Sequence, residues 1–149
     1  MYELLLAVHV LCAVIWVGGS VIMHVFGRRA VKRGPERQLE FTKDAIQIGN
    51  WLYAPLSVIV LIAGVPLVDE AGYGYGDFWI TIGFLGFLNS FLLGVAYYPR
   101  AGRQYEQIAA GDGPGSPAAQ AIYRRTANVS MYELAVLLLV VIDMAVKPG

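Results

Sequence analysis

The sequence predicts an all-α membrane protein, a single four-transmembrane-helix bundle over residues 1–149. Two observations predict this fold class. Hydrophobic residues make up 57% of the chain and charged residues only 15%, whereas a soluble domain carries about 25% charged residues. The hydrophobic residues also gather in long runs, each close to the roughly 20 residues that a helix needs to cross a bilayer. This pattern excludes a water-soluble monomer.

The runs place the predicted spans at about residues 4–26, 45–68, 78–98 and 127–146. The first three contain no Asp, Glu, Lys or Arg. The fourth contains Glu133 and Asp143, but residues 135–141 are all apolar and therefore cover every side of a helix. Burial on all sides fits this segment better than a surface helix does, so we expect a fourth span.

The charges between the spans predict the orientation. Lys and Arg residues occur in the connections 27–44 and 99–126, and none occurs in 69–77. By the positive-inside rule, the first and third connections are cytoplasmic loops and both termini lie outside, in a bacterial inner membrane. The Gly- and Pro-rich stretch at 111–117 divides the third connection into two helical extensions.

Aromatic residues near the expected membrane surfaces are interpreted as interfacial anchors. On the outer side they are Tyr73, Tyr75, Phe78 and Trp79, and on the inner side they are Trp51, Tyr97, Tyr98 and Tyr123. Within the spans, Gly18 and Gly19 favour close helix packing, and Pro55 and Pro66 favour a kink in the second helix.

One face of the first helix is predicted to look into the bundle. Residues on it recur at spacings of three and four; they are His9, Cys12 or Ala13, Trp16, Ser20 and Met23. Ionisable groups at membrane depth are costly and are usually functional or paired. His9 and Met144 are predicted to share the outer level of the bundle, and His24 lies near the inner interface.

Polar residues also occur near the middle of the membrane. From the helical rise, Ser20, Asn50, Asn89 and Glu133 fall near mid-membrane, and we predict that they form one buried network. Two roles are open for Glu133. It either relays protons as a catalytic group or pairs with a neighbouring helix, since both satisfy the cost of burying a carboxyl group.

Several function classes are excluded. Cys12 is the sole cysteine, so one chain cannot form a disulfide or a multi-cysteine metal site. The chain has no glycine-rich nucleotide fingerprint, no HExxH and no CxxC. The formal net charge is zero, which argues against a nucleic-acid partner, whereas a lipid bilayer is the expected surrounding.

Residues 8–19 read Val-His-Val-Leu-Cys-Ala-Val-Ile-Trp-Val-Gly-Gly, so that a histidine is followed by a tryptophan and a glycine at His9, Trp16 and Gly19. This pattern resembles the first helix of HemJ-type protoporphyrinogen oxidases and of the related CopD copper-resistance domain. The chain end is also similar to HemJ, with an intramembrane Glu133, an aliphatic run and a terminal Val-Lys-Pro.

The resemblance implies that His9 is an axial ligand of a b-type haem, with Trp16 and Gly19 beside it. Met144 is the candidate second ligand at matching depth, since His/Met ligation of haem is established chemistry. His24 is a further candidate, although an interfacial histidine is the alternative. HemJ carries a lysine in its third helix and residues 78–98 contain none, so the reaction itself stays open.

Three functions therefore compete. The first is a haem-binding protein with a redox or haem-biosynthesis role, which as an enzyme would be a membrane oxidoreductase similar to protoporphyrinogen oxidase. The second is copper transport or sensing, with His9, Cys12 and Met144 as a soft Cu(I) site. The third is a non-catalytic accessory subunit of a membrane complex. The small size also favours a homo-oligomer.

Overall fold

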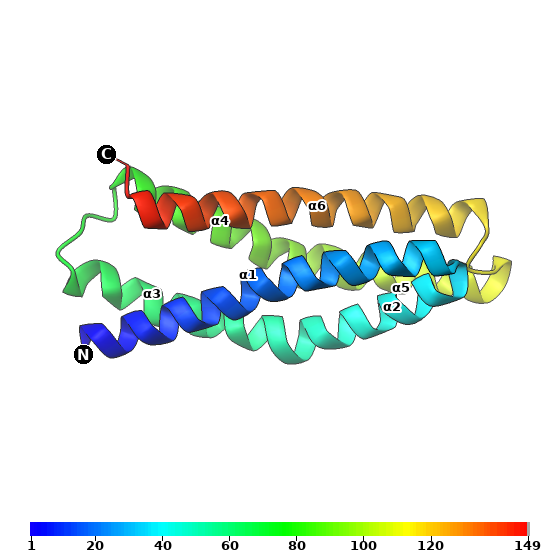
Figure 1. Ribbon diagram of the computed structural model, residues 1–149, viewed down its shortest axis with the longest axis horizontal. Coiled ribbons are helices and arrows are strands. Elements are labelled where there is room, and N and C mark those ends of the chain that lie inside the picture. The colour runs from blue at the N-terminus through cyan, green and yellow to red at the C-terminus, as the bar shows by residue number, and fades with distance from the viewer. Residues whose placement is uncertain (149) are drawn as a thin grey trace.

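The computed structural model describes residues 1–148, which form four long helical rods (Figure 1). The first rod is α1 (Tyr2–Arg33) and the fourth is α6 (Pro117–Val146). The second rod consists of α2 (Pro35–Ile48), the π-helical turn η1 (Gly49–Tyr53) and α3 (Ala54–Glu70). The third consists of α4 (Phe78–Leu92), the π-helical turn η2 (Leu93–Tyr97) and α5 (Tyr98–Asp112).

This architecture confirms the predicted fold class. Each rod is long and apolar enough to cross a membrane, and each predicted span lies within one rod. No strand occurs in the described part of the chain. The fourth span, which contains Glu133 and Asp143, is thus a continuous helix like the first.

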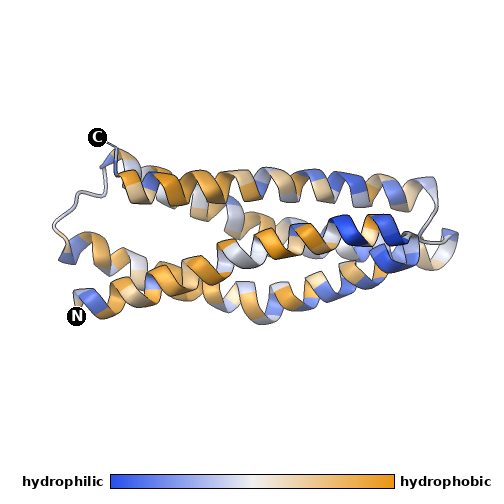
Figure 2. Ribbon diagram, viewed as in Figure 1, coloured by the Kyte–Doolittle hydropathy of each residue, from blue (hydrophilic) through white to orange (hydrophobic). Residues whose placement is uncertain are grey.

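The rods run alternately up and down. Figure 1 shows both chain ends and the 71–77 connection at one end of the bundle, which we call the terminal end. The other two connections lie at the opposite end, which we call the basic end because helix segments rich in Lys and Arg gather there (Figure 2). The side of the membrane that each end faces stays a prediction from the charge distribution.

The basic end is more helical than the sequence predicts. A loop is expected over residues 27–44, but the structure breaks the helix only at Gly34, whose φ of 106° favours glycine. Over residues 99–126, the predicted division into two helical extensions is confirmed, since α5 ends at Asp112 and α6 begins at Pro117. The helical segments at the basic end pack on one another. For example, a Cβ at Gly102 of α5 would collide with Ile46 of α2.

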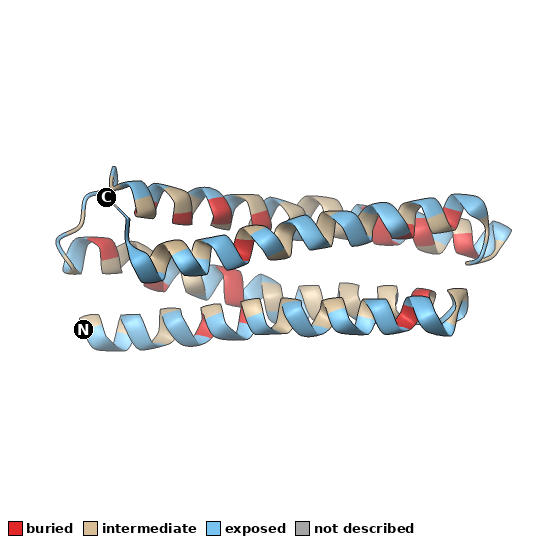
Figure 3. Cartoon of the chain, turned by 45° about the horizontal axis from the view of Figure 1, so that its top comes forward, coloured by how far each residue is buried: buried red, intermediate tan, exposed pale blue. Residues whose placement is uncertain are grey.

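A small core joins the helices at the basic end. Tyr105, Ala119 and Tyr123 are buried there, and Figure 3 shows buried residues gathered in this region. The Tyr123 hydroxyl donates to the Gly27 carbonyl at 3.2 Å, and the Gln120 amide donates to the Gln38 side chain at 2.5 Å. Tyr123 is therefore a packing residue that joins α6 to α1, and its predicted role as an interfacial anchor is wrong.

Glycines set the close contacts nearer the terminal end. A Cβ at Gly86 of α4 would collide with Val140 of α6, and one at Gly83 would collide with Met144. Gly64 of α3 similarly gives room to the His9 ring of α1. Small residues let helix backbones approach each other in a membrane, so the tightest pairs here are α4 with α6 and α1 with α3.

The surface of the rods is apolar and exposed, as expected for contact with lipid. Val14 on α1 and Leu139 on α6 are each 63% exposed, and Trp51 of η1 is 80% exposed. No water-soluble protein of this size leaves so much continuous apolar surface uncovered. A lipid bilayer is therefore the natural surrounding of the bundle.

Polar and aromatic contacts tie the terminal end together. The Lys147 amine donates to the Tyr73 hydroxyl at 2.9 Å and lies over the rings of Tyr73 and Trp79, 4.8 and 5.2 Å from their centroids. The Tyr75 hydroxyl donates to Asp69 at 2.9 Å. This hydrogen bond, burial and the nearby carboxylate raise the pKa of Tyr75.

We expect Lys147→Ala to loosen the last turn of α6 without changing the rest of the bundle. The variant loses a cation–π contact of about 0.5–1 kcal/mol for an exposed site. Hydrogen–deuterium exchange should rise in the last turn of α6 and in the 71–77 connection. Lys32→Ala, which also removes an exposed lysine but at the basic end, is the matched control, and equal exchange in the two variants would contradict this prediction.

Candidate functional site

A partly enclosed cavity of about 480 Å³ lies between the rods in the half of the bundle nearer the basic end. Its lining comes from all four rods. The lining is mostly apolar, and its polar members are Ser20, His24, Arg28, Thr42, Asn50, Tyr53, Ser57, Ser90, Tyr98, Tyr105, Tyr123, Thr126, Ser130 and Glu133. A cavity of this size with polar groups converging on an apolar interior is typical of a small-molecule site.

The cavity ends near the middle of the bundle. Trp16 of α1, Ser57 of α3, Ser90 of α4 and Leu134 of α6 are the lining residues nearest the terminal end on their rods. Trp16 is buried and contacts the Phe87 ring edge-on, with centroids 6.1 Å apart. The close helix contacts at Gly83 and Gly86 lie beyond this level. The lining therefore ends at this level, which we call the blind end of the cavity.

One face of α1 forms a side of the cavity. Trp16, Ser20 and Met23 line it, followed by His24 and Arg28 nearer the basic end. Cys12, one turn before Trp16, is buried. These positions confirm that the predicted face of the first helix looks into the bundle. The Ser20 hydroxyl donates to the Trp16 carbonyl at 2.9 Å, and its oxygen also lies beside the Tyr53 hydroxyl of the second rod.

Both π-helical turns border the cavity, and each precedes a proline. Pro55 follows η1 and Pro99 follows η2, each as the second residue of the next α-helix. Proline has no N–H to donate and its ring clashes with the preceding turn, and a wider π turn relieves this conflict. The kink predicted at Pro55 is thus present as a π turn. Tyr53 and Tyr98, at the ends of these turns, both line the cavity.

A carboxyl group lies at the blind end of the cavity. Glu133 Oε2 accepts a hydrogen bond from the Tyr98 hydroxyl at 2.5 Å. The Ser90 hydroxyl lies beside this carboxyl but has no partner in hydrogen-bonding geometry, although Ser90 is only 1% exposed. Glu133 is therefore paired with a neutral tyrosine, and its neighbourhood keeps an unused hydrogen-bonding group.

The predicted mid-membrane network has different members. Ser20, Asn50 and Glu133 all line the cavity, but Asn89 does not; its side-chain oxygen accepts from the exposed Tyr132 at 3.3 Å. Tyr98, predicted as an interfacial anchor, is the partner of Glu133. Sequence reasoning missed Tyr53, Ser90 and Tyr98 as site residues. The sequence does contain a signal for Tyr53 and Tyr98, because each is followed closely by a proline. Pro55 lies two residues after Tyr53, and Pro99 directly follows Tyr98.

The two histidines have different surroundings. His24 lines the cavity, and its Nδ1 is 3.4 Å from the Ser130 hydroxyl. His9 does not line it; its ring packs against Gly64, and its Nδ1 is 3.0 Å from the Val60 carbonyl. A carbonyl accepts only, so Nδ1 of His9 is the donor in this contact.

The other predicted ligands lie apart from the cavity. Met144 packs against Gly83 of α4, whereas His9 packs against α3. Cys12 is a buried free thiol. Gly19 gives room to the Tyr53 ring, because a Cβ there would lie 2.6 Å from the Tyr53 hydroxyl, and Gly18 faces open space. Close packing at Gly19 is thus present, and ligation by His9, Cys12 and Met144 stays a prediction.

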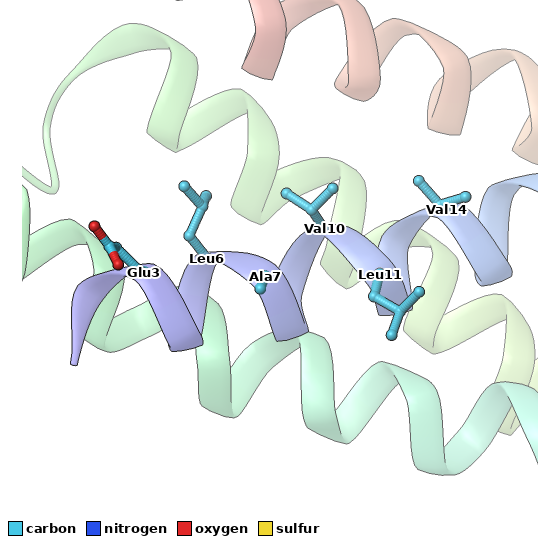
Figure 4. A pocket seen from close by; sticks show the side chains of 6 residues that line it. All are labelled: Glu3, Leu6, Ala7, Val10, Leu11 and Val14. Atoms are coloured by element: carbon cyan, nitrogen blue, oxygen red, sulfur yellow. The ribbon is translucent and has the colours of Figure 1, made fainter.

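Metal-binding side chains do not cluster in the part of the chain that the structure describes. Among residues 1–148, no three His, Cys, Asp or Glu side chains come close enough to hold a metal ion. A second, shallow depression lies along the first turns of α1 and is formed by residues of that helix alone, among them Leu6, Val10 and Val14 (Figure 4). Its apolar side chains are typical of a lipid-facing surface.

Comparison with known proteins gives the family. A model described as "Predicted integral membrane protein (DUF2269)" matches residues 3–148. No curated protein and no solved structure matches the chain. The matched range covers all four rods, which agrees with the membrane architecture described above. The chain therefore belongs to the DUF2269 family of predicted integral membrane proteins.

Proposed function

We propose that this membrane protein binds a b-type haem in the cavity between its helices, with a redox or haem-biosynthesis-related role. The observation that carries the proposal is the cavity of about 480 Å³, which is lined from all four rods and contains the imidazole of His24. Cavities of about 300–1,000 Å³ are typical of small-molecule sites. The resemblance of residues 8–19 to HemJ-type proteins supports the same class of ligand.

The lining residues fit a haem. Trp16, Phe91 and Leu134 supply apolar contacts around the blind end. If Nδ1 of His24 donates to Ser130, its Nε2 keeps the lone pair that binds iron. Arg28, nearer the basic end, supplies a cation for propionate groups. A bound haem supplies one-electron chemistry that amino-acid side chains lack.

His9 defines a second arrangement within the same proposal. The resemblance implies this residue as the ligand, and the Val60 carbonyl fixes its ring so that Nε2 is free to bind a metal. Met144 would be its partner. Because neither residue lines the cavity, the geometry favours His24, and the two histidines can be separated by mutation.

The proposal is tested by absorption spectra of the detergent-purified protein, oxidised and dithionite-reduced, with metal analysis of the same sample. A Soret band with about one iron per chain supports it. Bound copper without a Soret band would contradict it in favour of the His9, Cys12 and Met144 site. If the protein carries neither group after haem addition, the haem proposal is wrong and an accessory subunit becomes the better hypothesis.

A further inference from the structure

A buried carboxyl group that has no cationic partner is the starting point. Glu133 lies in the membrane-spanning part of α6, and its one described hydrogen bond comes from Tyr98. The one ion pair among residues 1–148 joins Arg37 and Glu40 on the surface of α2, so Glu133 takes part in none. A carboxyl group at this depth without a cation marks a functional site by default.

The cavity that Glu133 lines has room and polar side chains for water. Ser90 and Tyr105 both line the cavity, each is 1% exposed, and neither hydroxyl has a hydrogen-bond partner in the protein. Buried polar groups normally bind either the protein or ordered water. The cavity is roomy enough for several waters, since one water needs about 10–15 Å³. The Ser90 and Tyr105 oxygens themselves are closed off from the cavity, so water in it would bind the other polar side chains of the lining.

These hydroxyls lie at opposite ends of the cavity. Ser90 is beside Glu133 at the blind end, and Tyr105 belongs to the core at the basic end. They are separated by 15 residues of the third rod, or roughly 20 Å at the helical rise. Tyr98, Ser130 and Thr126 add hydroxyl groups to the lining along this length. Waters along the cavity would therefore connect Glu133 with the basic end.

The groups that face Glu133 permit a change of its charge. Tyr98 of α5 and Tyr53 of η1 are neutral phenols, and α4 contributes Ser90. On α1, the ionisable residues of the lining are His24 and Arg28, both nearer the basic end. No group facing the carboxyl from these elements therefore holds it permanently ionised.

We propose that Glu133 is a proton-exchanging site, connected by water to the basic end of the bundle and closed toward the terminal end. The carboxylic acid releases its proton to a cavity water, and the carboxylate takes one back by the same route. The Tyr98 hydroxyl donates to the carboxylate form. The bundle thus contains one half of a proton pathway, which ends at mid-membrane.

Infrared spectroscopy of the protein in lipid nanodiscs tests this proposal. The C=O band of a protonated carboxyl group should weaken as the pH rises, and it should shift promptly after transfer to D₂O. Glu133→Gln should abolish the band. Asp143→Asn is the matched control, because Asp143 is on the same helix and also has a buried oxygen without a partner, but does not line the cavity. This variant should keep the band.

Two further variants keep the proposal testable if Glu133→Gln fails to fold. Tyr98→Phe keeps the carboxyl group and removes its hydrogen bond, so the band should remain and change frequency. Ser90→Leu fills the blind end and should slow the shift in D₂O. A band that survives in Glu133→Gln, or one that does not shift in D₂O, would overturn the proposal. The readout itself involves no bound group. A haem in the cavity would displace the water that this proposal needs, so the spectra are recorded on protein that shows no Soret band.

Discussion

Replacing His24 with alanine is expected to abolish the Soret band of the purified protein, whereas replacing His9 leaves it in place. Among the described residues that line the cavity, His24 is the one histidine. His9 packs against α3 outside that lining. Loss of an axial histidine removes the iron–nitrogen bond that holds the haem and orients it. The effect is therefore expected to be all or nothing.

The His9→Ala variant is the matched control, since it removes the same side chain from the same helix. This variant should lose some stability, because it leaves the Val60 carbonyl without its partner and opens space beside Gly64. A single imidazole in the lining also predicts a five-coordinate, high-spin haem. A low-spin spectrum that disappears in both His9→Ala and Met144→Ala would instead assign the ligands to the terminal end.

Gly86→Ala is expected to destabilise the bundle by about 1–3 kcal/mol, the usual cost of overpacking a close contact. The new Cβ would collide with Val140 of α6, at one of the close contacts between α4 and α6. Because small residues at helix contacts are a main source of helix association in membranes, the variant should unfold at a lower SDS fraction in mixed micelles than the unchanged protein does.

Gly94→Ala is the control for this experiment. It lies in the same rod, but no atom would lie within 4 Å of its Cβ, so its stability should be unchanged or slightly higher through helix propensity. Adding Val140→Ala to Gly86→Ala should restore part of the lost stability, which a double-mutant cycle measures. Equal losses in Gly86→Ala and Gly94→Ala would contradict the close α4–α6 contact.

The resemblance and the cavity emphasise different residues. The resemblance rests on a pattern along one helix, where His9, Trp16 and Gly19 recur at fixed spacing. The structure separates these three, since Trp16 lines the cavity, Gly19 makes room for Tyr53, and His9 contacts α3. Spacing along a helix therefore predicts a shared face, but not which neighbour each residue contacts.

The inner aromatic residues show why the site could not be predicted in full. Tyr98 follows a hydrophobic run and precedes charged residues, which is the pattern of an interfacial anchor. The turn η2 lies directly before it. A π turn inserts one extra residue and so rotates the following helix by about 100°. This rotation places the Tyr98 hydroxyl on Glu133 instead of at the membrane surface.

The sequence by itself determined the fold class, the four spans and the inward face of the first helix. Each depends on local properties, because the length of an apolar run and its helical period are set by neighbours along the chain. Only the tertiary structure decided that residues 27–44 are helical, that Glu133 pairs with Tyr98, and that His24 rather than His9 lines the cavity. These features depend on contacts between rods that are distant in sequence. They also depend on two π turns, each of which rotates the helix that follows it, and a regular 3.6-residue period does not predict this rotation.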